Sequence, residues 1–473
     1  MFGKIQRIHF VGIGGIGMSG IAEVLLNLGY QISGSDLKNS AVTKRLATFG
    51  ASIFEGHSAS NIVGADVVVT SSAIAVDNPE VAEARRLHVP VIQRAEMLAE
   101  LMRMKYGIAV AGMHGKTTTT SMIAAVLAAG GLDPTVVVGG RVDAMGSNAR
   151  LGKSQYLVAE ADESDRSFLK LSPILSVVTN IDREHMDCYR DMRDVRRTFL
   201  EFMERVPFYG TVVGCNDDAA LRRLLPRIHR RVTTYGTSPG SDFLIGVEPS
   251  RHESRRAGDH GPLSQFRVTY KEDDLGEFTL RVPGAHNVLN ATAAIAVGTV
   301  LDISVEQIRS ALDGFRGVDR RFQLRGKAGG VSVIDDYGHH PTEIRATLAA
   351  ARQCGFRRVH VIFQPHRFTR TRDLMDGFAT AFGDADTLCV LDIYPASEKP
   401  IEGITADVLA NRIAGAGKRS VTYARSTADA VAAVSALAQP GDMILTLGAG
   451  SVSQLGPIIL QRLDTVAKPV APA

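Results

Sequence analysis

The stretch GIAVAGMHGKTTTT, residues 107–120, decides how the middle of this chain folds. Its apolar half, Gly107–Ala111, predicts a buried strand, and a helix is expected from Thr118. Gly112 and Gly115 let the backbone between strand and helix turn sharply, so that successive N–H groups point toward one centre. A strand, a glycine turn and a helix in this order are the setting of a phosphate-binding loop.

Lys116 and Thr117 give this turn the chemistry of an ATP site. In such loops the lysine reaches the β- and γ-phosphates, and the next hydroxyl binds Mg²⁺. The motif alone is short, because Val110 stands where the outer glycine of a common P-loop would be. An ordinary turn with a surface lysine is the alternative, and the strand–turn–helix setting favours a nucleotide. We therefore predict that ATP binds to Gly112, Met113, His114, Gly115, Lys116, Thr117 and Thr118.

A run of acidic residues follows the predicted strand Tyr156–Ala159, at the edge where parallel sheets place ligands. Four carboxylates in this run repel one another unless solvent or a cation intervenes: Glu160, Asp162, Glu163 and Asp165. Mg²⁺ prefers oxygen ligands, and Glu160, the first after the strand, is best placed to bind it. A solvated acidic loop is the alternative. His185 lies in a second polar run, after the predicted strand Leu175–Thr179, and is a metal ligand, an acid–base group or an ordinary loop residue.

A second glycine turn lies near the N-terminus, between a predicted strand, Ile8–Val11, and a predicted helix, Met18–Leu28. Its sequence GIGGIG, residues 12–17, with Asp36 nineteen residues beyond Gly17, matches the dinucleotide-binding fingerprint. The pattern indicates that a diphosphate can bind at the helix N-terminus, but not which nucleotide carries it. Taken alone, the turn favours NAD.

Two polar stretches follow predicted strands in the C-terminal third of the chain. DDYGHHP, residues 335–341, follows Val331–Ile334, and HRFTRTR, residues 366–372, follows Val359–Phe363. The three arginines of the second stretch can form forked hydrogen bonds to a carboxylate or a phosphate. A solvated basic loop is the alternative.

Three segments of alternating strands and helices follow one another along the 473 residues, which suggests about three domains. The expected fold class is α/β. We expect a Rossmann-like domain at residues 1–105, a central P-loop ATPase-like domain with a mainly parallel sheet at residues 106–318, and a second Rossmann-like domain at residues 319–473.

Three features of the central segment are interpreted from local pattern. Gln265–Tyr270 and Glu277–Val282 predict a hairpin that turns across residues 273–276. The polar stretch 248–260 predicts an exposed loop. An arginine cluster at residues 222–231 lacks interleaved aromatics, so it predicts a solvated helix face rather than a nucleic-acid contact.

Charge and cysteine content argue against several classes of protein. Lys plus Arg exceed Asp plus Glu by only three (53 against 50), so we expect neither nucleic acid nor an acidic membrane as a partner. Four cysteines without a CxxC pair predict no zinc site and no dithiol, and they fit a reducing cytosol. Five glycines within residues 11–20 fit a turn better than a signal-peptide core, so a cytoplasmic protein is expected.

Ten blocks of this sequence resemble the Mur ligase family, the ATP-dependent ligases of peptidoglycan synthesis. They cover nearly the whole chain: HFVGIGGIGMSGIA (9–22), SGSD (33–36), TSSAI (70–74), AGMHGKTTTTSM (111–122), EADESD (160–165), TNIDREHMD (179–187), PGAHNVLNATAA (283–294), DDYGHHPTEI (335–344), QPHRFTRT (364–371) and LGAGSVS (447–453). The resemblance implies ligation of L-alanine to the lactyl carboxylate of UDP-N-acetylmuramate through an acyl phosphate. It also reassigns the first glycine turn from NAD to UDP.

The resemblance further implies a role for each candidate site residue. The UDP-sugar would contact Gly14, Gly15, Ile16, Gly17, Asp36, His57 and Ser71. ATP would contact the central loop together with Asn287, Asn290, Arg321 and Asp336, and Mg²⁺ or Mn²⁺ would bind Thr117, Glu160 and His185. L-alanine would lie near Tyr337, His339, Arg367 and Arg370. Residues with a part in catalysis would be Lys116, His185 and His339.

One departure from the family favours its alanine-adding branch. Several family members carry a carbamylated lysine that bridges metal ions after the HMD segment, whereas here no lysine lies between Lys170 and Lys271. Three alternatives are kept: a ligase that recycles a murein tripeptide, an NAD-dependent dehydrogenase, and a nucleotide-gated switch. A dehydrogenase would leave the loop Gly112–Thr118 without a role. The sequence leaves the oligomeric state open, including a homodimer.

Overall fold

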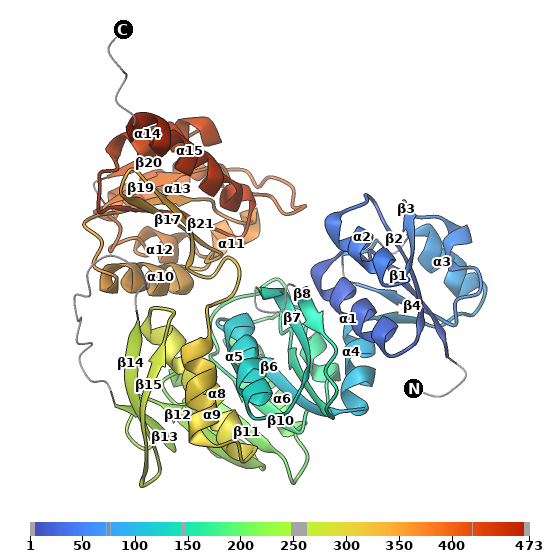
Figure 1. The fold of residues 1–473 in the computed structure, drawn as a ribbon. Coiled ribbons are helices and arrows are strands. Elements are labelled where there is room, and N and C mark those ends of the chain that lie inside the picture. The colour runs from blue at the N-terminus through green and yellow to red at the C-terminus, as the bar shows by residue number, and fades with distance from the viewer. Residues whose placement is uncertain are drawn as a thin grey trace. The chain divides into compact units, whose positions relative to one another are not determined.

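The computed structural model describes residues 5–71, 73–75, 77–142, 147–246, 263–418 and 420–467. This part of the chain forms an α/β protein with three mainly parallel sheets, which confirms the predicted fold class (Figure 1). The chain divides into two compact units. The first unit holds the N-terminal and central sheets, and the second holds the C-terminal sheet, so each is described by itself. The stretch 248–260, predicted as an exposed loop, lies outside the described residues, and the predicted domain boundaries stay predictions.

The N-terminal sheet has five parallel strands in the order β3-β2-β1-β4-β5. The strands are β1 (Arg7–Val11), β2 (Gln31–Asp36), β3 (Ser52–Glu55), β4 (Val67–Thr70) and β5 (Val91–Gln93). The helices are α1 (Ile16–Asn27), α2 (Ala41–Thr48), η1 (Ala59–Ile62), α3 (Pro79–Arg86) and α4 (Arg94–Arg103). The chain leaves β1 toward β2 on one side and reaches β4 on the other. Such a switch point leaves a crevice at the carboxyl ends of the strands.

The central sheet has ten strands in the order β15-β14-β13-β12-β11-β10-β6-β9-β7-β8. The strands are β6 (Tyr106–Ala111), β7 (Thr135–Val142), β8 (Ser147–Arg150), β9 (Tyr156–Glu160), β10 (Leu175–Val178), β11 (Thr211–Cys215), β12 (Arg231–Gly236), β13 (Phe243–Gly246), β14 (Ser264–Tyr270) and β15 (Asp273–Leu280). The pairs from β13 to β7 are parallel, and β14 and β8 pair antiparallel at the two sides. The middle strands are almost fully apolar and buried, as expected for a parallel sheet covered on both faces.

The helices of the central segment are α5 (Lys116–Ala129), η3 (Ser167–Lys170), α6 (Met192–Glu204), α7 (Ala219–Arg222), η4 (Leu225–Arg227), α8 (Ala285–Val300) and α9 (Val305–Gly314). Helix α5 is buried along most of its length, including the hydroxyls of Thr119 and Thr120. Its end packs closely against the start of the α9 region, because a Cβ on Gly130 would lie 2.8 Å from the side chain of Ile303. A buried helix held in this way fixes the position of its N-terminus.

The C-terminal sheet has six strands in the order β16-β17-β21-β18-β19-β20, and only β16 runs antiparallel to its neighbour. The strands are β16 (Gln323–Ala328), β17 (Val331–Asp336), β18 (Val359–Phe363), β19 (Thr387–Val390), β20 (Val421–Tyr423) and β21 (Met443–Leu447). The helices are α10 (Pro341–Gln353), α11 (Phe368–Asp373), α12 (Met375–Ala379), α13 (Ala406–Gly415), α14 (Thr427–Leu437), η5 (Ser451–Gln454) and α15 (Leu455–Ala467). One apolar core packs the sheet against α10, α12 and α13, and a separate core packs it against α14 and α15. The unit is therefore doubly wound.

The predicted hairpin is confirmed but its turn is misplaced, and a second local prediction is wrong. The hairpin β14–β15 turns at Lys271 and Glu272, before the predicted residues 273–276, because Lys271 adopts a positive φ of 54° and completes the tight turn early. The arginine cluster at residues 222–231 is not one helix face, because it spans α7, η4 and the first residue of β12. Arg230, within it, donates hydrogen bonds to the carbonyl oxygens of Val206 and Glu204. That arginine has a structural partner.

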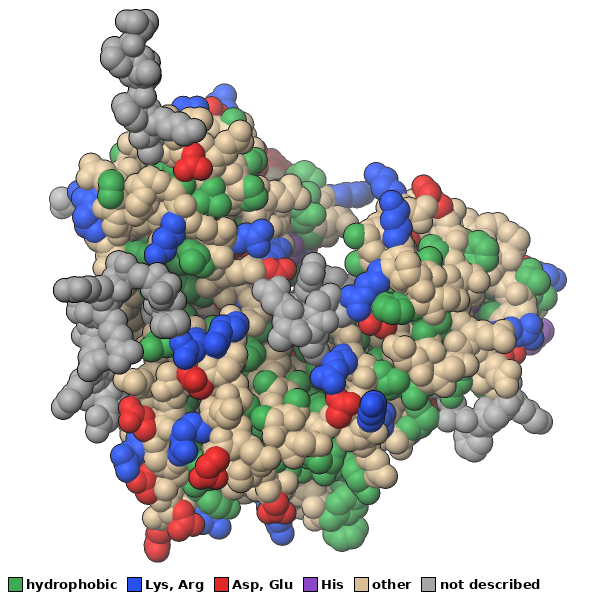
Figure 2. Space-filling view, viewed as in Figure 1, with side chains coloured by type: hydrophobic (Ala, Val, Ile, Leu, Met, Phe, Trp, Pro, Cys, Tyr) green, Lys and Arg blue, Asp and Glu red, His purple; other side chains and the backbone are tan. Residues whose placement is uncertain are grey.

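Basic and acidic side chains are interspersed on the face of the molecule in Figure 2, with no broad area of one sign. Mixed charge of this kind is what the near balance of 53 basic and 50 acidic residues leads us to expect. Among the described residues, no helix combines the length and the apolar character needed to span a bilayer.

Candidate functional site

The predicted phosphate loop forms a tight turn between β6 and α5. Gly112 has a φ of 134° and Gly115 a φ of 84°, values that L side chains rarely adopt. A Cβ on Gly112 would overlap the Thr179 hydroxyl, and one on Gly115 would lie 2.7 Å from Asn290 Oδ1. Gly115 is the N-cap of α5 and provides no side-chain cap. The first N–H groups of a buried helix therefore face the turn, where an anion can accept from them.

The neighbouring strand β10 holds this loop in place. Asn180, just after β10, accepts a hydrogen bond from the His114 amide at 2.9 Å and donates one to the His114 carbonyl at 2.9 Å. The Thr179 hydroxyl donates to the same carbonyl at 2.7 Å. Because β6 and β10 pair in parallel, these residues meet the loop at the carboxyl edge of the sheet. Our sequence analysis did not identify either residue as part of the site.

Lys116 forms an ion pair with Glu163. Its Nζ lies 2.7 Å from Glu163 Oε1 and also donates to the carbonyl oxygen of Gly112 at 2.7 Å. Burial alone would lower the pKa of Lys116, but the nearby carboxylates, Glu163 foremost, outweigh it and raise the pKa. The lysine is thus kept as an ammonium ion. Glu163 is fully buried, and it, rather than Glu160, is the acid of the run that contacts the loop lysine.

His185 lies beside the same carboxylate. Its Nε2 is 3.4 Å from Glu163 Oε1, and its backbone has a positive φ of 56°. Glu160 ends β9, which pairs with β6 in parallel, so its carboxyl group starts at the same edge of the sheet as the loop. Glu163 Oε2 is buried and has no hydrogen-bond partner among the described residues. Carboxylate oxygens, a hydroxyl and an imidazole form a donor set that suits Mg²⁺ or Mn²⁺.

The first glycine turn is closed by Asp36. The Gly14 amide donates to Asp36 Oδ2 at 2.9 Å, and the Gly12 and Ile13 amides donate to the Ser35 carbonyl. In the dinucleotide-binding fingerprint the corresponding acid binds a ribose, whereas here one of its oxygens belongs to the turn. The other candidate residues of this domain also follow strand ends, His57 just after β3 and Ser71 just after β4. The structure therefore brings all the predicted UDP-sugar residues to one edge of the N-terminal sheet: Gly14, Gly15, Ile16, Gly17, Asp36, His57 and Ser71.

A buried glutamate supports this edge and was missed by our sequence analysis. Glu80, fully buried near the start of α3, accepts hydrogen bonds from Ser35 and Asn61 at 2.6 Å each. Its Oε2 lies 3.1 Å from His57 Nδ1, and its Oε1 lies 3.7 Å from His9 Nε2. Burial alone would raise the pKa of Glu80, but these partners outweigh it and lower the pKa to about 2. No motif signals such a residue, because its partners come from four separate segments.

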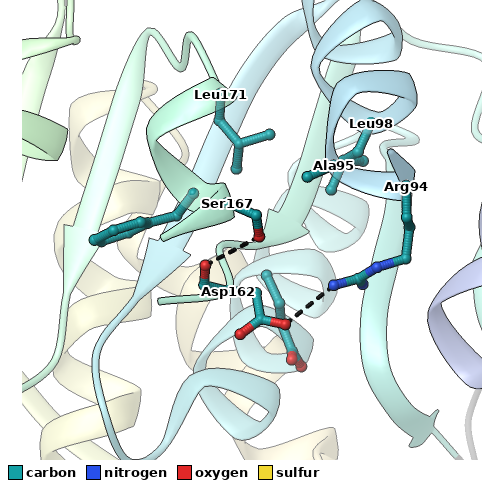
Figure 3. Close-up of a pocket in the computed structure, with 8 residues that line it drawn as sticks. Arg94, Ala95, Leu98, Asp162, Ser167 and Leu171 are labelled. Carbon is teal, nitrogen blue, oxygen red and sulfur yellow. Dashed lines mark hydrogen bonds and ion pairs between the residues drawn. The ribbon is translucent and has the colours of Figure 1, made fainter. Parts of the chain in front are cut away.

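A small cavity lies between the start of α4 and the acidic run (Figure 3). Arg94 and Asp162 face each other across it, with Nη2 3.0 Å from Oδ2. The remaining lining is part polar and part apolar: Ala95, Leu98, Glu160, Ser167, Phe168 and Leu171. This cavity links the N-terminal and central parts of the first unit.

In the second unit, the candidate residues gather at the carboxyl ends of β17 and β18. Asp336 is buried, which raises its pKa, and it accepts hydrogen bonds from the amides of Phe322 and Gly338. The guanidinium of Arg321 lies over the Tyr337 ring, 5.1 Å from its centre. Asn287 donates to the Pro283 carbonyl at 2.7 Å. Asp336 and Asn287 therefore each have hydrogen-bond partners within the protein.

His366 joins the predicted amino-acid residues, although our sequence analysis did not select it. Its ring stacks on Tyr394 at 5.5 Å between centres, and the His339 ring lies 5.7 Å away. Arg370 Nη1 lies 3.1 Å from His366 Nδ1, and Arg367 pairs instead with Glu398 at 2.6 Å. Burial, then the positive surroundings, lower the pKa of His366 to about 3. A neutral imidazole beside an arginine can accept a hydrogen bond but adds no charge.

Comparison with known proteins identifies related sequences over the whole chain. Residues 7–106 match the Mur ligase family catalytic domain, residues 110–298 the Mur ligase middle domain, and residues 320–450 the Mur ligase glutamate ligase domain. The chain is 71% identical to a UDP-N-acetylmuramate–L-alanine ligase of Koribacter versatilis, over 100% of both chains. It is 64% identical to the enzyme of that name from Acidobacterium capsulatum, over 98% of this chain and 99% of the relative.

Solved structures that resemble this chain include ligases with related names. The crystal structure of a UDP-N-acetylmuramate-alanine ligase from Thermotoga maritima superposes with a TM-score of 0.78 at 29% identity, covering 97% of this chain and 99% of that one. A murein peptide ligase from Psychrobacter arcticus superposes with a TM-score of 0.66 at 24% identity, covering 99% of this chain and 100% of that one. The second likeness shows a shared fold only.

The buried Glu80 predicts a pH dependence of stability. Its pKa of about 2 in the folded protein lies below the ordinary 4.5, so ionised Glu80 stabilises the fold above pH 4.5 and this contribution is lost as the pH falls toward 2. The full contribution is on the order of 3 kcal/mol. Glu80→Gln should therefore be less stable at pH 7 and lose less stability between pH 5 and 3 than the parent protein. Urea unfolding followed by circular dichroism measures this, with the exposed Glu100→Gln as control. Parallel pH profiles for parent and Glu80→Gln would contradict it.

The buried ion pair of Lys116 and Glu163 predicts that substitutions of the two residues have coupled effects on stability. Lys116→Met leaves the buried Glu163 carboxylate without its cation, which should cost about 3 kcal/mol of unfolding free energy. The double variant Lys116→Met/Glu163→Gln removes both charges and should recover most of that loss. Unfolding midpoints of the parent, both single variants and the double variant form a complete cycle. Additive effects in the cycle would show that the two groups do not interact.

Proposed function

The chain belongs to the Mur ligase family, and we propose that it joins L-alanine to the lactyl carboxylate of UDP-N-acetylmuramate at the expense of ATP. The observation that carries this proposal is the occurrence of two anion-binding glycine turns, each at the carboxyl edge of its own sheet, in a chain 71% identical to an enzyme of that name. One turn suits the diphosphate of the sugar nucleotide, and the other suits ATP. The products are UDP-N-acetylmuramoyl-L-alanine, ADP and phosphate.

The chemistry explains why a nucleotide triphosphate is needed. A carboxylate does not acylate an amine in neutral water, because an oxide would have to leave. Attack of a lactyl carboxylate oxygen on the γ-phosphorus forms an acyl phosphate and releases ADP. The neutral amine of L-alanine then attacks the acyl carbon, and phosphate leaves from the tetrahedral intermediate.

The residues of the central loop have defined parts in the first step. Lys116 is held as an ammonium ion, so it can offset the charge on the transferring phosphoryl group, and the N–H groups at the start of α5 can donate hydrogen bonds to phosphate oxygens. Thr117, Glu160 and His185 fit Mg²⁺ or Mn²⁺, and Glu163 Oε2 is a further oxygen at the same edge. A bound divalent ion would supply charge stabilisation at the phosphates.

The acceptor would bind in the second unit. Arg370 can hold the L-alanine carboxylate, and Tyr337 and His339 line the same place. His185 and His339 are candidates for the base that keeps the amine neutral. Arg367, paired with Glu398, contributes to this surface through that ion pair.

A cytoplasmic location is part of the proposal, supported by the four cysteines, all free. The oligomeric state, including a homodimer, stays open. NAD is disfavoured, because Gly14 occupies one oxygen of the acid that would bind the ribose.

The proposal predicts strict substrate dependence of phosphate release. Release from ATP should require UDP-N-acetylmuramate and should rise further when L-alanine is added, because the acyl phosphate needs both partners to turn over. The measurement is phosphate release with each substrate omitted in turn, and with L-alanine, glycine, L-serine or the murein tripeptide as acceptor. Preference for the tripeptide would assign the chain to peptide recycling, and release without the sugar nucleotide would indicate a switch protein.

Loss of the loop lysine predicts loss of activity with the fold retained. The double variant Lys116→Met/Glu163→Gln keeps charge balance in the interior, so it is the suitable test of chemistry. Its kcat should fall by roughly 100-fold or more, the scale of removing one preorganised charge stabiliser. Glu163→Gln alone is the matched control for the removed carboxylate. Activity of the double variant within tenfold of Glu163→Gln would rule out the lysine as a phosphate ligand.

A further inference from the structure

Arg94 lies between the two proposed nucleotide sites of the first unit. It is the first residue of α4, directly after β5 of the N-terminal sheet. On one side, a Cβ on Gly17 in the first glycine turn would lie 2.5 Å from Arg94 Nη1, so the guanidinium packs directly over that turn. On the other side, Nη2 donates to Asp162 Oδ2 at 3.0 Å, in the acidic run of the central sheet (Figure 3).

The guanidinium of Arg94 has capacity for a further ligand. A guanidinium carries five N–H donors in a planar fork. Among the described residues, the contact with Asp162 is the one hydrogen bond that Arg94 makes. Its side chain is 28% exposed, and it lines the cavity shared with Glu160 and Ser167. Donors therefore remain for an anion that enters beside the ion pair.

Most of the charged side chains in and beside this cavity are acidic, so an acidic substrate needs a cation there to bind. Glu160 and Asp162 line it, and Glu163 lies just beyond with Lys116 already paired to it. A carboxylate that approaches the phosphate loop along this route meets three acids. Arg94 is placed to offset their repulsion, and an arginine can bind a carboxylate through two parallel hydrogen bonds.

We propose that Arg94 binds the lactyl carboxylate of the sugar nucleotide and thereby selects a UDP-sugar that carries an acid. This inference rests on the proposed function, because it takes the diphosphate to bind at Gly14–Gly17 and ATP at Gly112–Thr118. The reacting carboxylate must extend from the first turn toward the second, and Arg94 contacts the first turn and the acidic run beside the second. The residue is thus a determinant of binding and specificity.

Two nucleotides that differ only in the acid separate this role from a general contact. UDP-N-acetylglucosamine has the same diphosphate and sugar as UDP-N-acetylmuramate but lacks the lactyl group. Arg94→Gln should weaken binding of UDP-N-acetylmuramate by about 10- to 100-fold, the range for a hydrogen bond to a charged group, and change binding of UDP-N-acetylglucosamine by about twofold or less. Isothermal titration of both nucleotides measures this. Arg103→Gln, on the exposed end of the same helix and paired with Glu100, is the control and should change neither.

A second variant separates direct binding from relief of repulsion. Arg94→Gln leaves Asp162 without its cation, and that alone could repel an acid. In Arg94→Gln/Asp162→Asn the extra charge is gone, and binding of UDP-N-acetylmuramate should remain at least 10-fold weaker than in Asp162→Asn alone. Recovery in the double variant, or equal losses for both nucleotides in Arg94→Gln, would overturn this inference and leave the proposed function standing. A parent protein that binds neither nucleotide would overturn both.

Discussion

An ammonium ion and a carboxylate held 2.7 Å apart, Lys116 and Glu163, form the interaction on which the candidate site depends. The pair exists because β9 and β10 flank β6, so that residues far apart in the chain start from one edge of the sheet. A buried pair of this kind gains from Coulomb attraction but is costly when either partner is removed. The surrounding contacts therefore act together: Asn180 and Thr179 hold the loop, and Tyr189 donates a hydrogen bond to the Glu163 carbonyl.

The N-terminal sheet also holds a glycine turn and a buried charge in place, but with different residues. Its glycine turn is closed by Asp36 rather than by a neighbouring strand's amide, and its buried charge is Glu80, surrounded by Ser35, Asn61 and two histidines. In both sheets a carboxylate holds a group at the carboxyl edge: Asp36 holds the Gly14 amide, and Glu163 holds the Lys116 ammonium. Polar groups that are already held in place lose little entropy when an anion binds, and the binding free energy is more favourable as a result. Two such edges in one unit suit a reaction that must hold two phosphorylated compounds at once.

Local pattern predicted the parts of this architecture that depend on neighbours in sequence. The strand Gly107–Ala111, the turn that follows it and the start of α5 were all readable, because glycine spacing and apolar runs are local signals. The identity of the acid that pairs with Lys116 was not readable. Glu160 and Glu163 differ by three positions, and the choice depends on how the chain turns after β9, which the sequence does not show. Asn180, Glu80 and His366 were missed for the same reason, since each acts through partners brought together by strand order. The early turn at Lys271 was missed for another reason: lysine is not a residue that tight turns favour, so nothing in the pattern indicated its positive φ.

The N–H donors of Lys116 limit how this lysine can contact a phosphate. Its ammonium group has three N–H donors, and in this structure they are directed at Glu163, at the Gly112 carbonyl at 2.7 Å and at the Met113 carbonyl at 3.4 Å. A phosphate bound in the loop can be contacted by this lysine only if at least one of those bonds is exchanged. In the proposed ATP complex, a triphosphate would bring more negative charge to Lys116 than a single carboxylate does, and Glu163 would keep His185 beside it. The ion pair therefore keeps the lysine charged and near the turn.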